Sequence, residues 1–332
     1  MPNARIHTFA LAAALAAGLA CVALAQSPTP APVAATPTAA ATPPATPPGS
    51  RLISVIRNKL SANDLRSAES AAEVYLQTQG DDGSYLLGLS WVARGALLTG
   101  ELDRATDYVA DVRKRCEARM ARGVRPDQDD SLEIALGAAI EVEAQLRARQ
   151  RGKADALRFL RGELARYPVP VSLQTRIHKR INMLDLEGKP APAWVPEDHA
   201  GETPKTLAEL RGRPVLVYLW DKGCGDCRAQ GPTLCRVASK YADLAVVPIT
   251  RFAGKTAEEH EHDKARMDSV WTAEYAPLGK TGVVIGDAAA LEYGGSSTPT
   301  IVLIDRKGVV RRYTPTRLTE RDLTSAIELA RR

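Results

Sequence analysis

The sequence predicts two folded domains in series, an all-α domain over residues 51–185 and an α/β domain over residues 186–332. In the first domain, apolar residues recur at helical spacing and strand signals are almost absent. In the second, short runs rich in Val and Ile alternate with longer helical stretches. That alternation is typical of a central mixed sheet with helices on both faces. A chain of 332 residues is long enough for both domains.

The first residues form a separate leader. A basic start at Arg5 leads into an alanine-rich apolar run that ends in the tripeptide ALA at positions 23–25. Signal peptidase cuts after such small-x-small endings. We therefore predict a signal peptide at residues 1–25 and an exported protein of the periplasm or cell envelope. Two alternatives stay open: a lipoprotein signal with Cys21 as the lipidated residue, or an uncleaved anchor.

Composition sets two further expectations. Residues 26–50 are almost entirely Pro, Ala and Thr, which offer little apolar surface to bury. We predict an extended, semi-rigid linker there. The formal net charge of +5 is small for this length and is spread along the chain, so no nucleic-acid partner is expected.

The all-α domain is predicted to consist of helices joined by tight turns. Ser61 to Asp64 is a suitable helix start. The apolar positions that follow it are Leu65, Ala68, Ala72, Val74 and Leu76. Two helical hairpins come next, turning at Gly100–Glu101 and at Gly152, and they resemble tetratricopeptide-like hairpins loosely. Such stacks usually offer a groove for a partner, and a helical spacer without a ligand is an equal alternative.

The α/β domain begins near Gly188. Its predicted strands are 214–219, 244–249 and 300–305, and its predicted helices are 225–242, 257–273 and 319–331. A further run at 309–313 follows the turn signal Lys307-Gly308. It should pair with 300–305 as an antiparallel hairpin.

Cysteine usage favours one dedicated pair. After signal cleavage the chain keeps four cysteines, Cys116, Cys224, Cys227 and Cys235. Export places them in an oxidising compartment, where a disulfide is permitted. Four are too few to staple a scaffold of this size. We expect Cys235 to be a small core residue, and Cys116 has no evident partner.

The stretch WDKGCGDC at 220–227 places the pair between a predicted strand and a predicted helix. Cys224 then lies at a helix N-terminus, where free N–H groups and the helix dipole favour an attacking thiolate. Cys227, one turn later, is placed to resolve a mixed disulfide. Zinc needs four ligands, and neither a second CxxC nor a well-spaced histidine pair exists. The cluster His260–Asp263 is the one other candidate, and we predict no metal.

These residues belong to a longer series of motifs. The series comprises Gly188-Lys-Pro-Ala-Pro, Leu210-Arg-Gly-Arg-Pro, Trp220, Cys224-x-x-Cys227-Arg-Ala, Pro232, Tyr293-Gly294, Thr298-Pro299-Thr300, Ile304-Asp305 and Gly308. Over about residues 186–332 the chain thereby resembles the TlpA-like (TlpA, ResA and DsbE type) branch of the thioredoxin superfamily. The resemblance implies a thioredoxin-like fold and an extracytoplasmic thiol-disulfide oxidoreductase with catalytic Cys224 and Cys227.

The same resemblance implies how substrate is held. Pro299 should follow a cis peptide bond beside the cysteines, and the Thr298 backbone should pair with a substrate strand. Trp220 is expected to join them in binding substrate. Pro232 should kink the helix that Cys224 begins.

The chain departs from the resemblance at three positions. Gly223 stands where many members have Trp before the first cysteine, which widens access. Tyr218 stands where cytoplasmic thioredoxins have a buried Asp, and Gln230 where the TlpA-like branch often has Glu. Both familiar proton acceptors are therefore missing.

Asp226 is the one carboxylate between the two cysteines, and Lys222 is the nearby cation. The negative charge disfavours either thiolate and Lys222 opposes it, so both are predicted to tune the couple. A less stable thiolate makes a less stable reduced form, which predicts a reducing couple. Asp226 could instead take the proton from Cys227, or be a solvated residue without a role.

The sequence thus predicts a protein thiol-disulfide oxidoreductase, a reductant that needs no organic cofactor or metal. Its expected partners are substrate proteins with disulfides, an upstream redox protein as electron donor, and a protein bound on the helical domain. The alternative is a helical-repeat binding or scaffold protein with a redox-inactive thioredoxin-like module. A metallochaperone using the CxxC ranks below both, because no His or Met motif accompanies the pair.

Overall fold

The computed structural model describes residues 48–279 and 281–332, and these belong to one compact unit. The predictions on the signal peptide, on Cys21 and on the linker up to residue 47 lie outside the described residues. No helix within the described ranges is long and apolar enough to cross a membrane.

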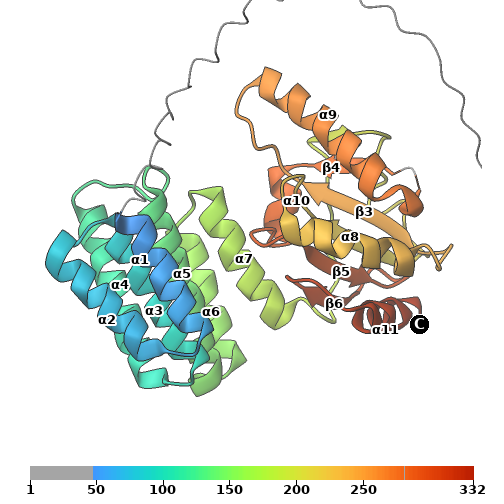
Figure 1. Cartoon of the computed structure of the whole chain (residues 1–332). Coiled ribbons are helices and arrows are strands. Elements are labelled where there is room, and N and C mark those ends of the chain that lie inside the picture. Colours follow the sequence, from blue (N-terminus) through green and yellow to red (C-terminus); the bar gives the residue numbers. More distant parts are fainter. Residues whose placement is uncertain (1–47, 280) are drawn as a thin grey trace, which may run out of the picture. The chain divides into compact units, whose positions relative to one another are not determined.

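Seven helices make up the first region (Figure 1). They are α1 Pro48–Ser61, α2 Leu65–Gln79, α3 Gly83–Leu98, α4 Leu102–Ala121, α5 Asp130–Arg151, α6 Lys153–Arg166 and α7 Val171–Asp185. The prediction of linker up to residue 50 is wrong at its end, because α1 begins at Pro48. Leu52 and Ile56 are buried and pack α1 into the helical core, which gives this segment the apolar contacts that the linker composition lacks.

The predicted helix boundaries in this region are confirmed. Asp64 caps α2, its side chain accepting the Ser67 N–H at 3.0 Å. The turns after α3 and α5 contain Gly100 and Gly152, at φ of 83° and 89°, a conformation that favours glycine. Val74, one of the apolar positions in the predicted helical pattern, does not join the core. Its side chain is 58% exposed, and the next residue, Tyr75, is buried instead.

The second region alternates strands and helices, as predicted. Its elements are β1 Asp198–Ala200, β2 Val215–Leu219, α8 Gly225–Ala238, β3 Ala245–Thr250, α9 Ala257–Glu274, the 3₁₀ turn η1 Ala276–Leu278, β4 Val283–Ile285, α10 Asp287–Glu292, β5 Thr300–Ile304, β6 Val310–Thr314 and α11 Glu320–Arg331. The strands β1 and β4 and the helix α10 are additions to the predicted set. They are too short to produce a clear periodic pattern.

The sheet is mixed, with strand order β1-β4-β3-β2-β5-β6. The central strand β2 pairs in parallel with β3 and antiparallel with β5, and β5 forms the predicted hairpin with β6. Leu216 and Tyr218 of β2 face a core formed with α8, α9 and α11. Val215 and Val217 face the opposite core, to which α10 contributes. Helices therefore cover both faces, which confirms the predicted fold class.

Candidate redox site

The two cysteines lie where β2 ends and α8 begins. Cys224 is the N-cap residue of α8. The Asp221 carboxylate accepts the Gly223 N–H at 2.7 Å, and the Asp221 carbonyl accepts the Cys224 N–H at 3.0 Å. This tight turn sets the position of Cys224. Asp221 was not among the predicted residues, although an Asp two residues before a Gly is a recognisable turn signal.

The Cys224 sulfur is half-buried and makes two contacts. It accepts the Cys227 N–H at 3.1 Å, which is one of the free donors of the first helical turn. It also donates to the Thr298 carbonyl at 3.3 Å. A sulfur in this place receives the positive end of the helix dipole and is open to a reaction partner.

Cys227 has a different environment. Its side chain is 1% exposed. Burial, followed by the contact with Cys224, raises the pKa of Cys227 to about 12, although the Asp221 backbone and Thr298 act in the opposite direction. One cysteine of the pair is thus accessible at a helix start, and the other is a buried thiol one turn below.

Two tyrosines converge under this turn. The Cys227 carbonyl accepts the Tyr218 hydroxyl at 3.2 Å and the Tyr275 hydroxyl at 3.1 Å. Burial is the main reason that the pKa values of both tyrosines lie well above the ordinary value, so the two groups act as neutral donors. Tyr218 therefore has a defined contact in the place where thioredoxins have an acid. Tyr275 was missed because nothing in the sequence connects it with residue 227.

The loop with Thr298 and Pro299 lies against the cysteines, as expected. The peptide bond between the two residues is cis. Pro299 is buried and Thr298 is half-buried. The Thr298 carbonyl is the acceptor for Cys224, so residues 74 positions apart in the chain meet at the site.

Three comparisons with known proteins concern this region. The family model of the AhpC/TSA family matches residues 187–313. The thiol:disulfide interchange protein DsbE of Pseudomonas fluorescens biotype C is 31% identical over 126 residues, which are 37% of this chain and 64% of that protein. The thioredoxin-like protein YneN of Bacillus subtilis is 25% identical over 157 residues, which are 47% of this chain and 86% of that protein.

Residues 187–313 are thus similar to the AhpC/TSA family and to thioredoxin-like proteins of the DsbE and YneN type. A solved structure with the same likeness is that of a secreted Mycobacterium tuberculosis disulfide oxidoreductase. It is 19% identical, and the match covers 40% of this chain and 95% of that one with a TM-score of 0.32. The two structural and sequence relatives are described as a disulfide oxidoreductase and a thiol:disulfide interchange protein.

A cavity of about 340 Å³ lies beside the two cysteines. Its walls come from the carboxyl ends of β2 and β3 with the residues after them, from α10 and from the Thr298 loop. Trp220, expected to bind substrate, lines this cavity but is 2% exposed. Its ring packs against Trp271 and Tyr275 at centroid distances of 5.3 and 5.8 Å. Such burial favours support of the cavity wall rather than direct contact with a substrate.

Lys222, the cation predicted to favour a thiolate, forms a buried ion pair with Asp263. Lys222 is 9% exposed, and its Nζ lies 2.8 Å from Asp263 Oδ1. Burial raises the pKa of Asp263, but Lys222 and the N–H groups of Ala253 and Gly254 outweigh it and lower that pKa to about 2. Lys222 is therefore paired with Asp263, whose carboxylate also accepts the Ala253 and Gly254 N–H groups of the loop after β3, and its tuning of the couple stays a prediction.

Asp226 points to the surface. Its side chain is 67% exposed and forms an ion pair with Arg317 at 3.5 Å. No hydrogen bond joins it to Cys227 among the described residues, so a direct proton transfer between these two groups gains no support. Gln230 is buried and accepts the Leu318 N–H at 2.8 Å, which ties α8 to the chain after β6.

Cys116, Cys235 and His260 have packing contacts. Cys116 and Cys235 are buried, and burial raises the pKa of each. The His260 ring stacks on Phe252 at 3.9 Å, and within the described ranges no three His, Cys, Asp or Glu residues are grouped to hold a metal. All four described cysteines are free thiols.

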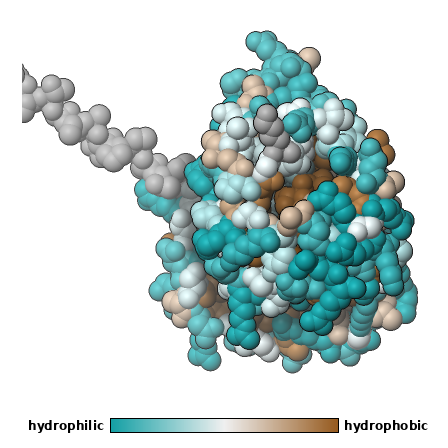
Figure 2. Space-filling model, turned by 90° about the vertical axis from the view of Figure 1, so that its right-hand side faces the viewer, coloured by the Kyte–Doolittle hydropathy of each residue, from teal (hydrophilic) through white to brown (hydrophobic). Residues whose placement is uncertain are grey.

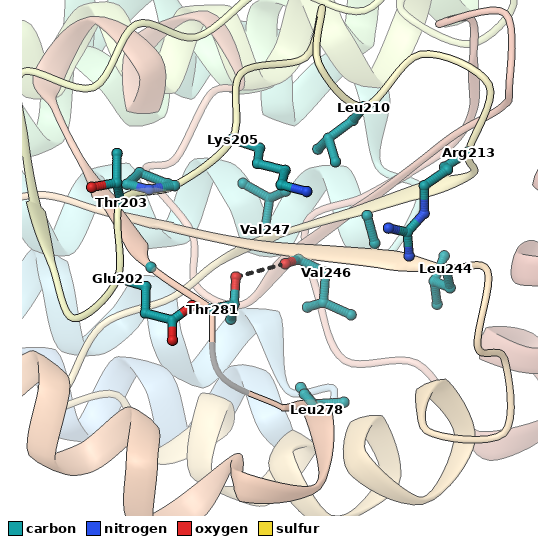
Figure 3. A pocket seen from close by; sticks show the side chains of 13 residues that line it. Glu202, Thr203, Lys205, Leu210, Arg213, Leu244, Val246, Val247, Leu278 and Thr281 are labelled. Atoms are coloured by element: carbon teal, nitrogen blue, oxygen red, sulfur yellow. Dashed lines mark hydrogen bonds between the residues drawn. The ribbon is translucent and has the colours of Figure 1, made fainter.

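A second cavity, of about 220 Å³, lies at the opposite ends of the strands (Figure 3). It is lined where β3 begins, by Leu244, Val246 and Val247, whereas the couple follows the carboxyl end of β2. Thr281 donates to the Val246 carbonyl at 3.3 Å within it. This second cavity is not part of the redox site.

Figure 2 shows the face on the right of Figure 1 as largely hydrophilic with one apolar hollow.

Proposed function

We propose that this protein is an exported thiol-disulfide oxidoreductase that reduces disulfides in substrate proteins through Cys224 and Cys227. The observation that carries the proposal is the asymmetry of the pair. Cys224 caps a helix and is accessible, whereas Cys227 is 1% exposed one turn below. Attack by the first sulfur and release by the second require this arrangement.

The reaction proceeds in two exchanges. The Cys224 thiolate attacks one sulfur of the substrate disulfide, the substrate S–S bond breaks, and the departing sulfur takes up a proton. Cys227 then loses its proton and attacks Cys224 Sγ. The second substrate sulfur leaves and is protonated, so two electrons have passed to the substrate and Cys224 and Cys227 form a disulfide. An upstream dithiol protein must reduce that disulfide before the next cycle.

The proposed direction, reduction, rests on Cys227. The raised pKa of this thiol, about 12, reflects a thiolate that burial destabilises. A destabilised Cys227 thiolate makes the reduced form less stable and favours a reducing couple, the reverse of strong oxidants whose reduced form is stabilised. Asp226 contributes less to this direction, because its carboxylate is largely exposed and paired with Arg317.

The cavity beside the couple supports a protein substrate. Its residues include the carboxyl ends of β2 and β3 and Thr298, next to the Cys224 sulfur. We infer that an extended substrate segment lies there with its backbone along Thr298. Export is part of the proposal and rests on the leader pattern that ends at positions 23–25. The division into a signal peptide, a linker, a helical domain and a redox domain is likewise proposed.

Reduction of insulin disulfides, followed with dithiothreitol as electron source, tests the proposal. The wild type should accelerate the reaction, Cys224→Ser should abolish the acceleration, and Cys235→Ser should leave it unchanged as a matched control. A wild type no faster than Cys224→Ser would instead favour a scaffold protein with a redox-inactive thioredoxin-like module. That alternative draws on the absence of both familiar acids at Tyr218 and Gln230.

A further inference from the structure

Helix α7 of the first region packs against the segment that leads to Thr298, here called the approach loop (residues 292–297). Asn182 of α7 donates to the Glu292 carbonyl at 2.8 Å, and α7 also contacts α10. A Cβ atom at Gly294 would lie 2.5 Å from the Lys179 backbone, and its φ of +65° also favours glycine. The packing is therefore close enough to require glycine in the approach loop.

Lys179 makes the contact nearest to the couple. Its Nζ donates to the Ser297 hydroxyl at 3.1 Å. Ser297 directly precedes Thr298, whose carbonyl oxygen accepts a hydrogen bond from the Cys224 thiol, 3.3 Å from Cys224 Sγ. Two covalently adjacent residues thus join a lysine of α7 to the reacting cysteine.

The Lys179 ammonium is held firmly from its other side. Glu141 of α5 is 3% exposed, and its Oε1 lies 2.8 Å from Lys179 Nζ. Arg94 and Arg176 bind the other oxygen of Glu141 at 3.0 and 2.9 Å. Burial raises the pKa of Glu141, but the cations, Arg176 first, hold it well below its usual range. A permanently ionised carboxylate therefore anchors Lys179.

We propose that Lys179 is a positioning residue of the redox site: it fixes the approach loop so that the Thr298 backbone is in place for a substrate segment. Helix α7 and the Glu141 cluster are then a structural part of the site, although they lie outside residues 187–313, which the family model matches. The substrate-binding step rests on the proposed function. The placement of the approach loop does not.

A purely structural role for Lys179 would be to neutralise Glu141. Three other cations, Arg94, Arg176 and Arg180, remain around that carboxylate when Lys179 is removed. Lys179→Met should therefore fold, and the contact it specifically loses is the one with Ser297. The matched control is Lys153→Met, which removes an exposed lysine of the same region that pairs with Asp185 at 2.9 Å.

Steady-state reduction of a protein disulfide by four variants tests the substrate step. Lys179→Met and Ser297→Ala should each raise KM about fivefold with kcat within twofold, a range typical of residues that act through a neighbour. The double variant should be no worse than either single one, because both remove the same contact. Lys153→Met should match the wild type. Unchanged KM in Ser297→Ala, or additive effects in the double variant, would overturn the proposal.

Amide hydrogen exchange separates this proposal from the proposed function, because it needs no activity. Exchange in the approach loop and Thr298 should be at least about threefold faster in Lys179→Met and Ser297→Ala than in the wild type and in Lys153→Met. Unchanged exchange in both variants would overturn the positioning role even if the wild type reduces insulin. A wild type that fails to reduce insulin, with faster loop exchange in the variants, would leave the positioning role supported and reject the proposed function.

Discussion

Helices α4 and α8 each carry cysteine, and the two helices use it in opposite ways. Cys116 lies in the interior of α4, is 0% exposed, and has a pKa that burial raises to about 12. Cys224 caps α8, is half-buried, and receives a backbone N–H from the first turn. The place of a cysteine along its helix and its exposure therefore determine whether it can begin an exchange with another protein.

The two regions also differ in how they satisfy buried polar groups. In the helical region, Glu141 is buried among arginines and a lysine, so full charges compensate each other. Under α8, the neutral hydroxyls of Tyr218 and Tyr275 hold the Cys227 carbonyl. A net charge at that distance would shift a thiol pKa strongly in a buried environment. Neutral donors support the turn without that effect.

The largest expected difference between the cysteines of α8 and α4 is in the trapping of substrate proteins as mixed disulfides. Cys227→Ser leaves Cys224 able to attack but removes the resolving thiol, so mixed disulfides with substrate proteins should accumulate. Cys116→Ser should accumulate none. Non-reducing electrophoresis after expression measures the adducts. Adducts that persist when Cys224→Ser is combined with Cys227→Ser would contradict attack by Cys224.

Alkylation compares the same cysteines directly. At neutral pH, iodoacetamide should modify Cys224 at least about a hundredfold faster than Cys116, because only a thiolate reacts and burial also blocks access. With a pKa of about 12, Cys116 stays a thiol until strongly alkaline pH. Mass spectrometry of the modified peptides gives the rates. In denaturant the two should react alike, and equal rates in the native protein would contradict the comparison.

Removing a hydroxyl under α8 should have a moderate effect. Tyr275→Phe loses one hydrogen bond to the Cys227 carbonyl, which should lower the free energy of unfolding by about 1 kcal/mol and slow disulfide exchange. Tyr167→Phe in the helical region is the matched control, because the Tyr167 hydroxyl is buried without a hydrogen-bond partner among the described residues. Urea denaturation measures both. An equal loss of unfolding free energy in the two variants would contradict a stabilising hydrogen bond from the Tyr275 hydroxyl.

The smallest expected effect concerns Asp226. Its carboxylate is largely exposed and paired with Arg317, and exposed pairs contribute little. Asp226→Asn should therefore raise the redox potential of the couple by less than about 20 mV, where 30 mV corresponds to about 1.4 kcal/mol. Arg317→Gln should shift the potential the other way. Equilibration with glutathione measures both, and a lower potential for Asp226→Asn, or a rise well above about 20 mV, would contradict a small effect of this exposed charge.

Most of the fold could be predicted because its signals are local. The run 214–219 is apolar throughout, as expected for a strand buried on both faces, and Asp64 and Gly152 mark helix boundaries by their own chemistry. Val74 was placed wrongly because an approximate helical period does not distinguish an apolar residue on the exposed face of α2 from one on the buried face. The strands β1 and β4, of three residues each, depend on their neighbours in the sheet.

The sequence by itself determined which residues lie together at one place in the chain. The spacing of Cys224 and Cys227, their position between a strand and a helix, and the Thr298-Pro299 pair were all readable in order. These features depend on helix and strand geometry, which acts over a few residues.

The tertiary structure alone decided which distant groups surround the couple. It paired Lys222 with Asp263, placed Tyr275 under Cys227, and joined Lys179 to the loop before Thr298. Each of these contacts joins residues about forty or more positions apart, 48 for Tyr275 and 118 for Lys179. Only the packing of the folded chain brings these partners within hydrogen-bond distance. A contact of this kind forms over about 3 Å, and it leaves no periodic signal in the sequence.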